Sequence, residues 1–257
     1  MTFELHNLST GYHGHNRVHV VARNITAQLN EGSLTCLLGP NGAGKSTLLR
    51  TLAAFQPALE GEMLLDGKPL DSYTPKELAT RIGIVLTEKP ELGNMHTEEL
   101  VAMGRSPYTD FWGRMRQEDT AAVDEAIQLV GIADLRRRLV TTLSDGERQK
   151  VMIAKALAQQ TPIIMLDEPT AFLDFPSKVE VMLLLRRLAH EMNKTIFLST
   201  HDLELALQTA DCLWLMNKDQ LEIGTPDDLA ATGALPHFFS GPGITFDAQS
   251  RRFNISC

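Results

Sequence analysis

Cysteines and long apolar runs are scarce in this sequence. The 257 residues contain three cysteines, which are Cys36, Cys212 and Cys257. Because they are scattered and odd in number, we expect neither a disulfide framework nor a metal site built on them. No apolar run approaches the roughly 18 residues that a membrane-spanning helix needs. The first residues lack the basic start and the apolar middle of a signal peptide. These absences favour a protein of the cytoplasm.

Basic residues are also in short supply. Lys and Arg number 24 against 32 Asp and Glu, which gives a formal net charge of −8. A nucleic-acid surface needs clustered basic side chains, and the one basic run, Arg136–Arg138, is typical of a solvated helix end. We therefore expect no nucleic-acid partner. The length and the hydrophobic fraction of 43% suit one large α/β domain, or a core with a smaller lobe.

A glycine-rich stretch matches the phosphate-binding pattern G-x-x-x-x-G-K-[ST]. The apolar segment 34–38 before it is typical of a buried strand, and a helix is expected to begin near Ser46. Such a loop turns backbone N–H groups toward an anion, with Lys45 on the β- and γ-phosphates and the Ser46 hydroxyl on Mg²⁺. The alternative is a glycine-rich turn without a ligand. The residues predicted to bind nucleotide are Gly39, Pro40, Asn41, Gly42, Ala43, Gly44, Lys45, Ser46 and Thr47.

Polar side chains follow two further apolar strands. The segment 163–168 ends in Asp167, placed to hold Mg²⁺, and Glu168, placed to act as general base for water. Without the phosphate loop, this segment would indicate only a strand that runs into a Glu-Pro turn. His201 follows a strand at 195–200, where it either caps the next helix or contacts a γ-phosphate.

Two further positions keep a structural and a functional interpretation side by side. Ser144 is a natural N-cap ahead of a helix expected at 148–158. The backbone N–H groups at the start of that helix would form a second anion site. An ordinary capping box between Ser144 and Glu147 explains the same pattern. Tyr12 lies in a loop upstream of the phosphate loop, where it either packs on the sheet or stacks on a base.

The coarse organisation predicts an α/β fold with an inserted helical lobe. Alternating residues over 1–33 indicate antiparallel strands, and helical patterns dominate from about 88 to 160. We expect residues 1–87 and 161–257 to form the nucleotide-binding core. A loop with Phe111 and Trp112 indicates either a partner surface or aromatic packing beneath the loop. A terminal hairpin is expected within 240–257.

The order of these motifs resembles the ATP-binding subunit of ABC transporters. The resemblance rests on GPNGAGKST, LSDGE, IIMLDE, AFLD and His201, and it covers nearly the whole chain. The stretch 99–108 is similar to the branch that serves iron-siderophore, haem and cobalamin importers. The family resemblance implies a P-loop NTPase core with a mixed sheet and flanking helices, an N-terminal antiparallel β subdomain, and ATP hydrolysis coupled to transmembrane transport.

The resemblance also implies a role for each motif. Tyr12 would stack on adenine, the phosphate loop would hold ATP, and His201 would sense the γ-phosphate. Asp167 would support Mg²⁺, and Glu168 would activate water. Ser144 and Gly146 would bind the γ-phosphate of ATP that is held mainly by a partner subunit.

The same resemblance implies partners and a location. Two ATPase subunits would form a head-to-tail homodimer, with Asp174 in its interface. Membrane-spanning permease subunits would dock on the helical lobe, and a periplasmic or surface binding protein would act indirectly. The chain would therefore lie at the cytoplasmic face of the membrane as a peripheral subunit.

Two departures from the family pattern stand out. The signature usually reads LSGGQ, whereas this chain has Asp145 and Glu147 at the changed positions. A carboxylate that faces phosphate is unfavourable unless it turns away or pairs with Lys or Arg. Thr87 stands where a Gln usually contacts Mg²⁺; we expect Thr87 to reach the metal through water, with Glu88 as the alternative ligand. These departures leave open the alternative that the chain is a nucleotide-dependent regulatory module with low turnover. A soluble ABC-type ATPase that acts on ribosomes or DNA is a further alternative.

Overall fold

The chain divides into two units in the computed structural model. The first is formed by Met1–Ser72 with Arg186–Cys257, and the second by Tyr73–Leu185. The structure describes residues 1–14, 18–87, 93–110, 112–217, 220–239, 244–247 and 252–255.

The first unit begins with an antiparallel sheet, as the alternating N-terminal pattern predicts. Its strand order is β2-β1-β4-β5, and each neighbouring pair is antiparallel. Phe3 and Leu5 are fully buried, which is the inward side of the predicted alternation. The bounds of the strands are β1 Phe3–His13, β2 Val18–Leu29, β4 Glu60–Leu65 and β5 Lys68–Pro69.

A second group of strands in this unit carries the phosphate loop. β3 (Leu34–Leu38) lies between two parallel neighbours, β8 and β9, and β10 pairs antiparallel with β9. All five residues of β3 are buried, as expected for a parallel strand covered on both faces. The other elements are α1 Lys45–Leu52, β8 Thr195–Thr200, α7 Leu203–Thr209, β9 Cys212–Asn217, β10 Gln220–Gly224, α8 Pro226–Ala231 and α9 Ala234–Phe238.

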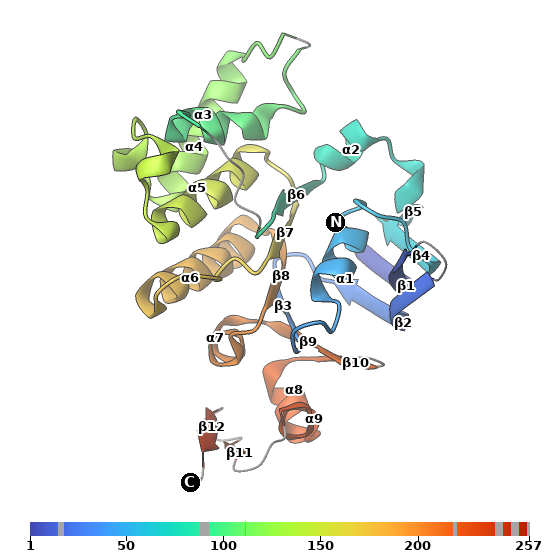
Figure 1. Ribbon diagram of the computed structural model, residues 1–257. Helices are drawn as coiled ribbons and strands as arrows, with labels where there is room; N and C mark the ends of the chain where they lie inside the picture. The colour runs from blue at the N-terminus through green and yellow to red at the C-terminus, as the bar shows by residue number, and fades with distance from the viewer. Residues whose placement is uncertain are drawn as a thin grey trace. The chain divides into compact units, whose positions relative to one another are not determined.

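The second unit combines a parallel strand pair with a group of helices (Figure 1). The predicted lobe contains α3, α4 and α5, which pack on one another. In α4 the apolar residues at helical spacing, Ala122, Ala126, Ile127 and Val130, are all buried. The elements are α2 Pro75–Ala79, β6 Ile82–Val85, α3 Thr97–Ala102, α4 Gln117–Val130, α5 Asp145–Ala158, β7 Ile163–Asp167 and the start of α6 Phe175–Met192.

The C-terminal hairpin is confirmed where the structure describes it. β11 (Ile244–Asp247) pairs antiparallel with β12 (Arg252–Ile255). The ends of the predicted segment, Ser240 and Cys257, lie outside the described residues, as does Phe111. Its neighbour Trp112 is described and is 77% exposed. No helix among the described residues is long and apolar enough to cross a membrane.

A buried ion pair connects parts of the helical group. Arg105 Nε donates to Asp119 Oδ1 at 2.9 Å, and Arg105 Nη1 also donates to the Ala158 carbonyl and to Gln160 Oε1. Asp119 Oδ2 accepts the backbone N–H of Arg116. That backbone hydrogen bond is the main cause of the lowered pKa of Asp119, and the Arg105 guanidinium adds to it.

We expect Asp119→Ala to lower the free energy of unfolding by about 3 kcal/mol, because it leaves a buried guanidinium without its carboxylate. The exposed neighbour Glu118 provides the control, and Glu118→Ala should change stability by less than about 0.5 kcal/mol. The folded-state pKa of Asp119 lies below its unfolded value, so its contribution is complete above about pH 4 and is lost as the pH falls further. Urea titrations at several pH values measure both effects; equal losses for the two variants would contradict the assignment.

Candidate nucleotide site

The phosphate loop has the backbone that its glycines predict. α1 begins at Lys45, and Gly42 and Gly44 have φ values of 80° and 100°, a region that L side chains rarely adopt. A Cβ added to Gly44 would lie 1.7 Å from Val21 Cγ1. The close packing of Val21 and the positive φ therefore both require glycine at position 44.

Lys45, the first residue of α1, is hydrogen-bonded to carbonyls of this loop. The residue is only 6% exposed, and its Nζ donates to the Gly39 carbonyl at 2.8 Å and to the Pro40 carbonyl at 3.3 Å. A helix N-terminus that carries a cation and an exposed Ser46 hydroxyl can bind a polyphosphate. The geometry of the first unit thus supports the predicted phosphate site.

A side chain that the sequence pattern did not single out links Tyr12 to this loop. Gln56 Nε2 donates to Thr51 Oγ1 at 2.9 Å and lies 3.2 Å from the Gly11 carbonyl and 3.4 Å from the Thr47 carbonyl. Gln56 therefore ties α1 to the strand residue just before Tyr12. No local sequence signal marks this link, because the Gly11 carbonyl is 45 residues from Gln56 along the chain. The sequence prediction that Tyr12 lies in a loop is wrong, because β1 continues to His13 and pairs Tyr12 with β2.

His201 lies just past the end of β8 and is exposed. The N-cap of α7 is Asp202, whose side chain accepts the N–H of Leu205. Helix capping by His201, one of the two interpretations from sequence, is therefore unnecessary in this structure. The γ-phosphate role of His201 stays a prediction.

The second unit brings Thr87, Asp167 and Glu168 together. Asp167 ends β7 and is 6% exposed, and the Thr87 hydroxyl donates to its backbone carbonyl at 2.7 Å. Glu168 has a φ of 47°, a strained value for a residue with a side chain, of the kind that clusters at functional sites. Glu88 lies outside the described residues.

A cavity of about 30 Å³ adjoins Glu168. Thr87, Glu168 and Asp145 all line it, together with Arg148. This volume is large enough to hold a water molecule. A carboxylate beside a space for water is what general-base activation of water requires.

The signature-like stretch forms a capping box at the start of α5. Ser144 Oγ accepts the N–H of Glu147, and the Glu147 carboxylate accepts the N–H of Ser144 at 2.7 Å. Arg138 Nη1 also donates to Glu147 at 2.9 Å. The pKa of Glu147 is lowered, first by the backbone hydrogen bond from Ser144. The Glu147 carboxylate is thus paired with Arg138. Pairing with Lys or Arg is one of the two ways, named above, in which an additional carboxylate is tolerated at this position.

The oxygen donors predicted to hold Mg²⁺ suit that ion. They are the hydroxyls of Ser46 and Thr87 and the carboxylate of Asp167, and Mg²⁺ prefers few carboxylates completed by water and substrate phosphate. The donor set therefore fits a metal that arrives with a nucleotide.

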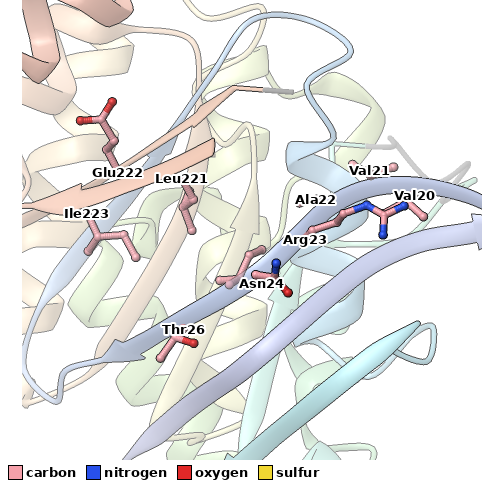
Figure 2. A pocket seen from close by; sticks show the side chains of 10 residues that line it. Val20, Val21, Ala22, Arg23, Asn24, Thr26, Leu221, Glu222 and Ile223 are labelled. Carbon is pink, nitrogen blue, oxygen red and sulfur yellow. The ribbon is translucent and has the colours of Figure 1, made fainter. Parts of the chain in front are cut away.

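A separate groove of about 680 Å³ lies between β2 and β10 in the first unit (Figure 2). Its lining mixes Arg23 and Glu222 with apolar side chains such as Val20 and Ile223. It shares one wall with the phosphate loop, since Val21 lines the groove and also packs against Gly44. None of the residues predicted from sequence to bind nucleotide or metal lines this groove.

We expect Glu147→Ala to lower the free energy of unfolding by about 1 kcal/mol, because it removes half of the capping box. Glu147→Gln restores the usual family residue and keeps an oxygen for the N–H of Ser144. It should therefore cost only a few tenths of a kcal/mol, from the lost pairing with Arg138. Urea unfolding of both variants measures the difference, and a loss as large for Gln as for Ala would rule out the capping role.

Comparisons with known proteins agree with this geometry. The family model described as ABC transporter matches residues 22–171. An ABC transporter ATP-binding protein of Methanocaldococcus jannaschii is 44% identical over 224 residues, which is 87% of this chain and 76% of that protein. The ferric enterobactin transport ATP-binding protein of Escherichia coli is 37% identical over 222 residues, 86% of this chain and 82% of that protein.

Solved structures agree as well. A metal-chelate-type ABC transporter in an inward-facing conformation matches with a TM-score of 0.79 at 27% identity, covering 93% of this chain and 88% of that chain. A dimeric bacterial ABC transporter cassette matches with a TM-score of 0.75 at 25% identity, covering 87% of this chain and 98% of that chain. The predicted fold, an antiparallel β subdomain with a mixed α/β core and a helical lobe, is confirmed. The chain belongs to the ABC transporter family and is an ATP-binding ATPase whose hydrolysis of ATP is coupled to transport.

Proposed function

We propose that this ATPase powers an importer for iron-siderophore, haem or cobalamin cargo. The phosphate loop, with Lys45 buried at the start of α1, is the observation that carries the nucleotide chemistry. Relatives named for the transport of ferric enterobactin, petrobactin and iron(3+)-hydroxamate support the cargo class. They are 35–37% identical to this chain.

ATP binds through its base and its phosphates. Tyr12 stacks on adenine, and the N–H groups of residues 39–47 surround the phosphates. Lys45 exchanges its hydrogen bonds to the carbonyls of Gly39 and Pro40 for phosphate oxygens, which gain more from a cation than neutral carbonyls do. His201 contacts the γ-phosphate.

Hydrolysis depends on the residues at the end of β7. Glu168 accepts a proton from the water that attacks the γ-phosphate, and its strained backbone and the adjoining cavity support this role. Ser46 and Asp167, with Thr87 through a water, hold Mg²⁺. When bound, that ion neutralises negative charge on the phosphates.

The assembly supplies the remaining groups. Two copies pair head to tail, so that Ser144 and Gly146 at the start of α5 approach the γ-phosphate held by the partner, with Asp174 in the interface. The helix N-terminus is suited to an anion. Permease subunits contact the helical lobe, which places the chain at the cytoplasmic face of the membrane. A periplasmic or surface binding protein delivers the cargo to the permease.

We expect Glu168→Gln to bind ATP normally, to lower turnover by about 100-fold or more, and to accumulate an ATP-bound dimer, because only proton acceptance is lost. Phosphate release and size-exclusion chromatography with ATP measure these effects. As a control, Lys45→Ala should weaken ATP binding by roughly tenfold or more, since a charged hydrogen bond is lost. Turnover by Glu168→Gln near that of the unmodified chain would exclude Glu168 as the base.

The cargo class is tested on the complete transporter. We expect the complex of this chain with the permease encoded by neighbouring genes to hydrolyse ATP faster when its binding protein carries a ferric siderophore, haem or cobalamin. The stimulation follows because cargo arrival changes the permease state to which the ATPase is coupled. ATP turnover with loaded and unloaded binding protein measures it. Stimulation only by an unrelated cargo, such as a sugar or an amino acid, would refute the assignment.

A further inference from the structure

The rings of Tyr12 and His19 form a stacked pair on the first sheet. Their centroids are 5.2 Å apart and their planes are inclined by 22°, within the range of favourable aromatic pairs. Tyr12 is 54% exposed and His19 is also exposed. His19 thus stacks on the Tyr12 ring, while more than half of Tyr12 stays exposed to solvent.

The backbone makes this pairing specific. Tyr12 on β1 lies opposite His19 on β2, after an irregularity in the register between Thr10 and Gly11. A Cβ added to Gly11 would lie 2.1 Å from the His19 carbonyl oxygen. The two strands can therefore approach this closely only at a glycine, and the approach sets the two rings opposite each other.

The same segment is anchored to the phosphate loop. Gln56 connects the Gly11 carbonyl with Thr51 and with the Thr47 carbonyl at the end of the loop. The Tyr12 backbone thus has a defined position relative to α1. The exposed Tyr12 side chain can still change its rotamer, and stacking on the His19 ring restricts that change.

We propose that His19 is a positioning residue for the nucleotide base. By stacking on one face of Tyr12, it holds the ring so that the opposite face receives the planar base of ATP. This inference rests on the proposed stacking of Tyr12 on adenine. His19 lowers the entropy that the Tyr12 side chain loses on binding, because the ring is ordered before the nucleotide arrives. Its effect is confined to ligands that have a base.

The experiment compares ATP with inorganic triphosphate, which has the phosphates but no base. Binding of each to the full-length chain is measured by calorimetry for the unmodified protein, His19→Leu, His19→Phe and Tyr12→Ala. Leu keeps the bulk of the side chain without a ring face, and Phe keeps the ring without the imidazole nitrogens. Val20→Thr is the matched control on the same strand, since Val20 lines the groove between β2 and β10.

We expect His19→Leu to weaken ATP binding roughly three- to tenfold, the range typical of one aromatic pair. Binding of triphosphate should not change, His19→Phe should restore ATP affinity, and Val20→Thr should resemble the unmodified chain. Steady-state turnover should show the same split, with a raised KM and an unchanged kcat.

Other outcomes would overturn the inference in distinguishable ways. Weakened ATP binding in Tyr12→Ala but not in His19→Leu would remove His19 and leave the role of Tyr12 intact. Equal loss of ATP and triphosphate binding in His19→Leu would mean that His19 only maintains the fold around the loop. If His19→Phe does not restore ATP affinity, the effect of His19 comes from a contact of its imidazole nitrogens and not from ring stacking. Unchanged ATP binding in Tyr12→Ala would refute the base-stacking step of the proposed function itself.

Discussion

The turn from β3 into α1 is the constraint on which the nucleotide chemistry depends. β3 is buried along its whole length between two parallel strands, so the position where the loop begins is fixed. The chain then turns through Gly42 and Gly44 with positive φ, and Val21 packs where a side chain at Gly44 would lie. This turn exposes the first N–H groups of α1 and keeps Lys45 beside them, so cation and helix dipole act on the same ligand.

Two of the departures from the family pattern, Glu147 and Thr87, are accommodated by local hydrogen bonds. Glu147 completes the capping box of α5 and pairs with Arg138, so its charge is balanced by a cation. Thr87 uses its hydroxyl on the backbone of Asp167, which ties the segment after β6 to the end of β7. A shorter side chain than the usual glutamine thus has a structural role of its own.

Local signals in the sequence predicted most of the elements. Apolar runs located β3 and β7, helical spacing located α4, and the cap pattern at Ser144 located the start of α5. The phosphate loop was also predictable, because its glycines, lysine and flanking elements are contiguous. These features depend on near neighbours, and periodicity reports near neighbours directly.

The sequence by itself determined the family, the phosphate loop and the residue types available for catalysis. Only the tertiary structure decided which distant residues meet. Thr87 and Asp167 are 80 residues apart along the chain, and Gln56 reaches a carbonyl 45 residues away. Tyr12 faces His19 after irregularities in the pairing of β1 with β2 that shift the register. A two-residue alternation predicts a strand but cannot count its bulges or choose its partner, because pairing is set by packing of the whole sheet.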